Sequence, residues 1–376
     1  MIDSVKKKSA RILTFDLMRG YFLVAIIFDH LNFFPNAFDW WSMRGNLFVT
    51  TAEGFFFISG LVLGIVRGAK LINEPFRYVT KLLLKRGVQL YLTSVILILI
   101  FTYVGWEFFM NNPNLKDGIA TPGTNLIELF WKTLTFQYFY GWADYLRLYA
   151  LFLLVSPLAM WLLRRGKWYL LLAANLFLWL LFPGAKETPD IIQELFQPLT
   201  WQLIFFGGMI VGFHWDSIVS WWRNRPVLQK RMIQTSLLSV ALITFVWNVL
   251  VVFGPRYFDL HSIGITSDSS YNLYIDLFDK ERLPFTRIDM FLIWFWAAFY
   301  LFRRFEQYIV RFLGWLLLPF GTNSLYVYTV HAFVIFFVHL YFHEAGLVSN
   351  FIISVAIVSL IRLMIHYKVL MKIIPR

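Results

Sequence analysis

The sequence predicts an all-α fold, a polytopic integral membrane protein of about ten transmembrane helices with both termini cytoplasmic. Of its 376 residues, 59% are hydrophobic and only 15% are charged, a composition that suits a chain folded in lipid and not a soluble domain. Apolar stretches of helical length recur along the whole chain, and lysine and arginine residues cluster before the first stretch and after every second one. We therefore expect a single membrane-embedded domain over residues 1–376.

Each predicted span is an apolar run bounded by charged or turn-forming residues. The first follows a basic segment, but no small-residue cleavage site comes after it, so we expect an uncleaved span and not a signal peptide. The ten spans lie near residues 13–33, 46–66, 88–106, 145–163, 168–183, 198–214, 233–253, 288–302, 318–341 and 347–366.

Positive charge sets the predicted orientation, because cytoplasmic loops are rich in lysine and arginine. The basic segments are Lys6–Arg11, Arg67–Arg86, Arg164–Lys167, Arg223–Arg231, Arg303–Arg311 and Lys368–Arg376, before the first span and after every even-numbered one. The net charge of +12 therefore indicates topology, and no nucleic-acid partner is expected. On the other side, the loops 107–142, 184–197 and 254–287 are aromatic and of mixed charge. They suit a carbohydrate or another polar partner, and equally suit ordinary solvated connections.

The stretch Asp16–Gly60 holds the strongest candidates for chemistry. An ionisable group at mid-membrane costs roughly 2.5 kcal/mol or more, so such groups are functional candidates by default. Arg19 and His30 are eleven positions apart, which places them on one helix face about 16 Å from each other. One interpretation is a general-base histidine with an arginine that holds an anionic donor. The other is that Arg19 and Asp16 neutralise each other at the interface while His30 caps the span.

Two acids are candidates to orient His30. Asp29 precedes it directly, and Glu53 lies in the second predicted span, where an acid needs a partner. The sequence does not decide between them. Ser59, beside Gly60, allows close helix approach, which is ordinary membrane packing.

Further polar residues have a structural and a functional interpretation each. Lys85 and Arg86 mark a cytoplasmic helix end or, together with Arg19, a basic mouth for a nucleotide-bearing donor. Gln202 makes an interhelical hydrogen bond or meets a substrate hydroxyl, and the nearby Gly207, Gly208 and Gly212 permit tight packing.

The segment GTNSLYVYTVH, residues 321–331, places polar groups on one helical face. Ser324, Tyr328 and His331 fall within about 60° of each other, as a packing seam or as a wall of the active cavity. His331, His339 and His343 match no zinc signature, and the chain has no cysteine, so no metal site and no cysteine chemistry are expected.

These motifs resemble a known family. Arg19, ten intervening residues and His30 resemble the R-x10-H signature of the acyltransferase-3 membrane proteins, and the closer similarity is to their OpgC branch, which includes succinyltransferases of osmoregulated periplasmic glucans. The similar segments are FDLMRG at 15–20, DH at 29–30, AEGFFFISGLVLGIV at 52–66, DYLRLYALFLLVSPLAMWLLRRG at 144–166, FQPLTWQLIFFGGMIVG at 196–212 and GTNSLYVYTVH at 321–331. One departure is Arg147, which stands where the branch often has proline.

The resemblance implies a membrane O-acyltransferase of the bacterial inner membrane. Its donor would be cytoplasmic acyl-CoA, with succinyl or acetyl as the acyl group, and its acceptor a hydroxyl of an extracytoplasmic glycan. It implies His30 as the base and Arg19 as the donor-side cation, with Ser59 and Arg86 in support.

Two other classes of function fit the same charges. A transporter or flippase of a glycan or lipid-linked glycan would use them as a relay, although transporters often show related halves and this chain has no such internal similarity. A non-catalytic partner in glycan export is the third hypothesis. The oligomeric state does not follow from the sequence.

Overall fold

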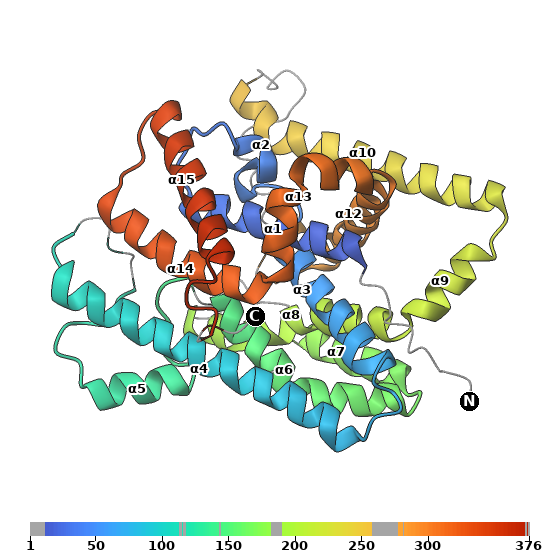
Figure 1. The fold of residues 1–376 in the computed structure, drawn as a ribbon, viewed down its shortest axis with the longest axis horizontal. Helices are drawn as coiled ribbons and strands as arrows, with labels where there is room; N and C mark the ends of the chain where they lie inside the picture. The colour runs from blue at the N-terminus through green and yellow to red at the C-terminus, as the bar shows by residue number, and fades with distance from the viewer. Residues whose placement is uncertain are drawn as a thin grey trace.

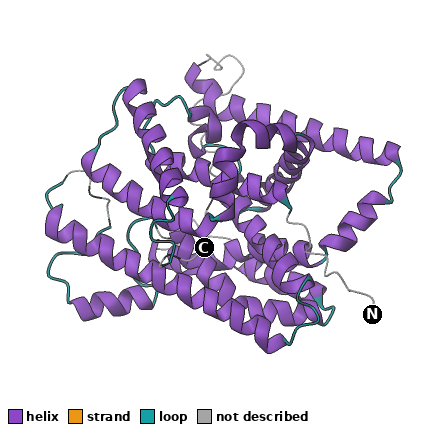
Figure 2. Ribbon diagram, viewed as in Figure 1, coloured by secondary structure: helices purple, strands orange, loops and turns teal. Residues whose placement is uncertain are grey.

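The computed structural model describes residues 12–112, 115, 118–142, 144–181, 190–257, 277–280, 282–372 and 374. Within these residues the regular structure is helical and contains no strand, which confirms the predicted all-α fold (Figure 2). The main helices are α1 (Leu13–Leu31), α3 (Thr51–Leu63), α4 (Phe76–Phe108), α6 (Asp144–Arg164), α7 (Trp168–Leu181), α8 (Asp190–Phe213), α10 (Val227–Tyr257), α12 (Phe285–Arg304), α13 (Glu306–Thr322), α14 (Ser324–Tyr341) and α15 (Leu347–His366). Shorter elements are α2 (Asp39–Ser42), η1 (Met43–Gly45), η2 (Gly64–Ala69), α5 (Leu126–Leu134) and α9 (Trp215–Arg223).

Seven helices of the described chain are long and apolar enough to cross a membrane, and an eighth is added if α8 and α9, which meet at a 63° bend, form one span. α1 falls outside this set because it carries Asp16, Arg19 and Asp29 within 19 residues. α7 falls outside it because it is a shorter apolar helix. The count of about ten spans and the cytoplasmic placement of both termini stay predictions.

The predicted ninth span, 318–341, contains a helix break. α13 ends at Thr322 and α14 begins at Ser324. The side chain of Asn323 donates to the carbonyl oxygen of Pro319 over 2.9 Å, and the hydroxyl of Thr322 donates to the same oxygen over 3.3 Å. The backbone nitrogen of Asn323 donates to the same oxygen over 3.2 Å, so the three bonds together close the last turn of α13.

Four glycines bring α8 close to the backbone of α3 and of η2, which follows α3 directly. A Cβ at Gly60 would lie 1.9 Å from the carbonyl oxygen of Phe205, and a Cβ at Gly64 would lie 2.3 Å from that of Met209. On the facing helix, Cβ atoms at Gly208 and Gly212 would lie 2.3 Å and 1.9 Å from backbone oxygens of α3. Small residues four apart on both helices form the usual close crossing of membrane helices. This confirms the tight packing predicted for Gly208 and Gly212, whereas a Cβ at Gly207 would meet nothing within 4 Å.

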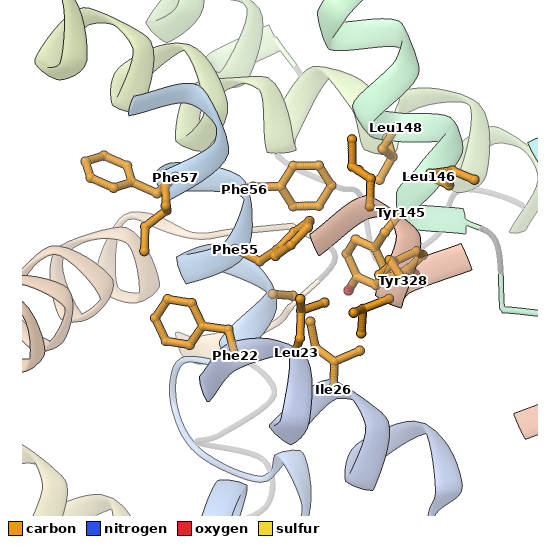
Figure 3. Packing of buried hydrophobic residues seen from close by; sticks show 14 of the residues in the cluster. Phe22, Leu23, Ile26, Phe55, Phe56, Phe57, Tyr145, Leu146, Leu148 and Tyr328 are labelled. Atoms are coloured by element: carbon orange, nitrogen blue, oxygen red, sulfur yellow. The ribbon is translucent and has the colours of Figure 1, made fainter. Parts of the chain in front are cut away.

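Three consecutive phenylalanines of α3 connect this crossing to the rest of the core. Figure 3 shows Phe55, Phe56 and Phe57 pointing in different directions from one turn of the helix. Phe57 packs edge-on against Phe295 of α12, with ring centroids 4.6 Å apart. Phe55 stacks on Tyr328 of α14 with centroids 6.2 Å apart. Because consecutive helical residues are about 100° apart, one short segment holds several helices around α1 and α3.

The outer helices lie around this core. In Figure 1, α4 runs along one edge of the molecule with α5 beside its far end, and α10 extends along another edge from α9. In the spanning part of α10 only 6% of residues are fully buried, so this helix lies at the periphery of the described structure.

Candidate functional site

Both ends of the Arg19/His30 face of α1 contact the same segment, residues 321–331. The Nη1 group of Arg19 donates to the carbonyl oxygen of Gly321 over 3.2 Å. Eleven residues further on, His30 Nδ1 lies 2.9 Å from His331 Nε2. The end of α13 therefore lies beside α1 at the level of the arginine, and α14 lies beside it at the level of the histidine. The structure brings together the two motifs that the sequence singled out separately.

Glycine makes this close approach possible. A Cβ at Gly20 would lie 2.0 Å from the carbonyl oxygen of Leu317, and a Cβ at Gly321 would lie 1.8 Å from that of Asp16. Side chains at either position would force α1 and α13 apart and would move Arg19 away from Gly321.

The hydrogen bonds of His331 fix which nitrogen of His30 is basic. His331 Nδ1 lies 2.5 Å from the carbonyl oxygen of Tyr328, which can only accept, so Nδ1 carries the proton. The Nε2 atom of neutral His331 is then an acceptor, and His30 Nδ1–H donates to it. In this tautomer the lone pair of His30 lies on Nε2, on the other side of the ring.

Burial distinguishes the two histidines. His331 is 0% exposed, and Tyr328 packs edge-on against its ring with centroids 4.7 Å apart. His30 is only half-buried. His339 Nε2 donates to the carbonyl oxygen of His30 over 3.1 Å and stacks on Trp142, which fixes the end of α1. Of the bonded pair, His30 is thus the more accessible ring and His331 the enclosed one.

The two acids proposed from the sequence have other partners. Asp29 accepts a hydrogen bond from the hydroxyl of Ser42 and interacts electrostatically with Lys280. Glu53 accepts from the backbone nitrogen of Thr50 over 3.1 Å in a capping box at the start of α3. Its other oxygen accepts from Nε of Arg287 over 2.6 Å. Neither acid lies in the chain of bonds from His30 Nδ1 to the Tyr328 carbonyl.

A basic cluster surrounds Tyr149 of α6. The Tyr149 hydroxyl interacts electrostatically with Arg86 of α4 and Arg19 of α1, and Arg86 also interacts with Arg67 of η2. All four side chains are half-buried. Guanidinium groups from three elements therefore converge on one region, and their planar forks suit phosphate or carboxylate. Lys85 is exposed and lies about 100° around α4 from Arg86, outside this cluster.

The remaining candidates lie in the surrounding packing. Ser59 Oγ donates to the carbonyl oxygen of Phe55, one turn earlier in α3, over 2.7 Å. Gln202 Nε2 donates to the carbonyl oxygen of Asn175 over 2.7 Å, which joins α8 to α7. Ser324 begins α14 and is half-buried. In the part of the chain that the structure describes, no three histidine, aspartate or glutamate side chains are placed to hold a metal ion.

Sequence reasoning missed Arg67, Tyr149 and Arg287. Arg287 is 0% exposed in the first turn of α12, but as the last residue of the predicted loop 254–287 it looked like an ordinary loop charge. The signal was present, since an arginine that enters an apolar helix needs an acid and Glu53 was the acid without a partner. Arg67 lies in a π-helical turn that no local pattern predicts, although such turns are frequent at functional sites.

Comparison with known proteins gives one match. The model of the family described as OpgC protein matches residues 11–373, nearly the whole chain. No curated protein and no solved structure matches it.

Proposed function

Because the chain belongs to the OpgC family, we propose that it is a membrane acyltransferase that moves an acyl group from acyl-CoA to a hydroxyl of a glycan. In this proposal the acyl group is succinyl or acetyl, the donor is cytoplasmic and the acceptor is extracytoplasmic. The membrane is the bacterial inner membrane, with both termini of the chain in the cytoplasm. The observation that carries the proposal is the hydrogen-bonded chain His30–His331–Tyr328 carbonyl on α1 and α14.

In the proposed reaction, His30 is the general base. Its Nε2 takes the proton of the acceptor hydroxyl while that oxygen attacks the carbonyl carbon of the thioester. The new C–O bond forms, the C–S bond breaks, and the departing sulfur takes the proton back from the imidazolium. His331 is a positioning residue, because its Nε2 accepts from His30 Nδ1–H throughout and keeps the His30 ring in the tautomer that presents Nε2.

The basic cluster is the proposed site for the donor's phosphates. Arg19 and Arg86, together with Arg67, supply forked donors near Tyr149. Arg19 and His30 lie about 16 Å apart along α1, and the flexible pantetheine arm of the donor would connect the two ends of this face. The bond from Arg19 to Gly321 holds the guanidinium against the end of α13, and the bond from His30 to His331 joins the other end of this face to α14.

Asp29 and Glu53 support His30 from a distance in this proposal. The half-buried carboxylate of Asp29 precedes His30 in the chain and favours the imidazolium electrostatically. Glu53 acts through its ion pair with Arg287, which joins the first turns of α3 and α12. Ser59 and Gln202 act through helix packing, and Ser324, Tyr328 and His331 line the α14 side.

Coenzyme A release from purified protein tests the proposal. The chain contains no cysteine, so a chromogenic thiol reagent detects only the released coenzyme. With succinyl-CoA or acetyl-CoA and a β-glucan oligosaccharide, we expect thiol release that depends on the acceptor, and an ester on the glycan by mass spectrometry. His30→Ala should lower the rate by about 10²- to 10⁴-fold, the usual contribution of a general base.

His366→Ala is the matched control, since His366 is an exposed histidine at the end of α15. It should retain the full rate. Near-normal acyl transfer by His30→Ala would refute the assignment of the base. Glycan movement across liposomes without any thiol release would instead support the transporter hypothesis.

A further inference from the structure

The outer face of the first half of α4 carries a shallow groove away from the candidate site. Its volume is about 640 Å³, and its lining includes Arg77, Lys81, Lys85, Leu84 and Val88. Every residue that lines it belongs to α4, so the groove opens to the surroundings and not toward another helix.

Three cations form a column along this groove. Arg77, Lys81 and Lys85 are four positions apart, so they follow one another on the same helix face, and all three are exposed. The lining of the groove contains no acid. Three like charges within about 12 Å of helix attract an anion.

An apolar column continues from the cations. Leu84, Val88, Leu92 and Ile96 are also four apart, and they are 39%, 46%, 48% and 55% exposed. The two columns overlap, because Leu84, the first residue of the apolar column, precedes Lys85, the last residue of the cationic column. A ligand that fits both would carry a negative charge at one end and a long apolar chain at the other.

The depth of these residues in a bilayer agrees with such a ligand. From Gly87 to Trp106, α4 has no charged residue over 20 positions, or about 30 Å, the thickness of the hydrocarbon layer. Lys85 and Lys81 then lie about 3 Å and 9 Å beyond its edge, at the level of lipid phosphates. Arg77 lies one turn further out.

We propose that this groove binds an anionic phospholipid. Its phosphate lies among Arg77, Lys81 and Lys85, and one acyl chain runs along the column from Leu84 to Ile96. The groove is separate from the Tyr149 cluster because Lys85 and Arg86 point in directions about 100° apart. Lys85, a donor-binding candidate by sequence, is thereby assigned to the lipid site.

Native mass spectrometry of the detergent-purified full chain tests the proposal. The protein is mixed with equal amounts of phosphatidylglycerol and phosphatidylcholine, and the bound lipids are counted. We expect a preference for phosphatidylglycerol that weakens as salt is raised. In R77Q/K81Q/K85Q this preference should fall at least tenfold, because each cation near a membrane surface contributes about fivefold.

Two further variants complete the design. R77K/K81R/K85R keeps the charges and should keep the preference. R225Q/K230Q/R231Q removes the same charge from the segment after α9 and should also keep it. Equal preference in the two glutamine variants would overturn the proposal. So would loss of coenzyme A binding by R77Q/K81Q/K85Q with its preference for phosphatidylglycerol retained, because the groove would then serve the donor.

Discussion

His30 on α1 and His331 on α14 are 301 positions apart in the sequence, and their Nδ1 and Nε2 atoms lie 2.9 Å from each other. His331 Nδ1 donates to the Tyr328 carbonyl, so its Nε2 can only accept. In the hydrogen bond between the two histidines, His30 is therefore the donor and His331 the acceptor. The donating ring of His30 is half-buried, and the accepting ring of His331 is fully buried.

Replacing His331 should lower the turnover number without changing donor binding. In His331→Phe the His30 Nδ1–H loses its acceptor, the tautomer is no longer fixed, and kcat should fall by about 10²-fold or more. In His331→Gln the amide oxygen can accept from His30 while the amide nitrogen donates to Tyr328, so part of the rate should return. Steady-state kinetics with varied acyl-CoA measures both, and KM for the donor should stay within about twofold.

Rescue by glutamine distinguishes positioning from simple packing. Phenylalanine is an aromatic replacement for a buried ring, so a purely structural role predicts that it is tolerated better than glutamine. If His331→Phe retained more activity than His331→Gln, the direction assigned to the histidine pair would be wrong.

Replacing Arg86 should weaken the binding of the acyl-CoA donor and leave the chemical step unchanged. In Arg86→Gln the cluster around Tyr149 loses one guanidinium, and KM for acyl-CoA should rise about tenfold or more while kcat changes little. Arg19→Lys keeps a charge but loses the fork and the geometry of the bond to Gly321, so it should raise KM as well.

The control for these variants is Arg223→Gln, an exposed arginine at the end of α9. It should leave KM unchanged. Competition by free coenzyme A provides a second measurement, because its inhibition constant should rise in parallel with KM. Unaltered donor kinetics in both Arg86→Gln and Arg19→Lys would place the phosphates elsewhere.

Breaking the Glu53–Arg287 pair should destabilise the fold more than it affects the chemistry. Both side chains are 0% exposed, and removal of one partner leaves a buried charge at a cost of about 3–5 kcal/mol. We expect a lower apparent melting temperature for Arg287→Met in fluorescence-detected size exclusion, with the rate per folded molecule close to that of the unchanged protein.

The double variant Glu53→Gln/Arg287→Met tests the pairing itself. Because it leaves neither buried charge alone, it should recover most of the stability that Arg287→Met loses. Additive losses would show that the two side chains do not act as a pair. A collapse of the rate in folded Glu53→Gln protein would restore the hypothesis that Glu53 serves the histidine directly.

The sequence predicted the helical class and which helix faces are polar, but not which side chains on different helices meet. Arg19 and His30 could be placed on one face because the period of a helix is known, and the segment 321–331 was identified as a polar stripe in an apolar run. That the two stripes lie against each other depends on the approach of α1, α13 and α14 at Gly20 and Gly321. A single sequence shows which faces are polar but not which helices meet.

The same limit explains why the sequence did not predict the partners of Asp29 and Glu53. Glu53 and Asp29 were expected near His30 because they are close to it in the sequence or share its region. In the structure, Glu53 pairs with Arg287, 234 positions away, and Asp29 with Ser42. Long-range pairing of this kind leaves no periodic signal in the chain.

The crossing of α3 and α8 can be tested at Gly208, and the adjacent Gly207 provides the control. A Cβ at Gly208 would lie 2.3 Å from the carbonyl oxygen of Phe57, whereas a Cβ at Gly207 would meet nothing within 4 Å. Gly208→Ala must therefore push two helix backbones apart, and we expect a loss of thermal stability and of acyl transfer, since α3 also supports Tyr328 through Phe55. Gly207→Ala should be neutral or stabilising by about 0.5–1 kcal/mol, because alanine favours the helix over glycine. Melting of the two variants under identical conditions decides the matter, and equal stability of both would mean that these helices do not cross at Gly208.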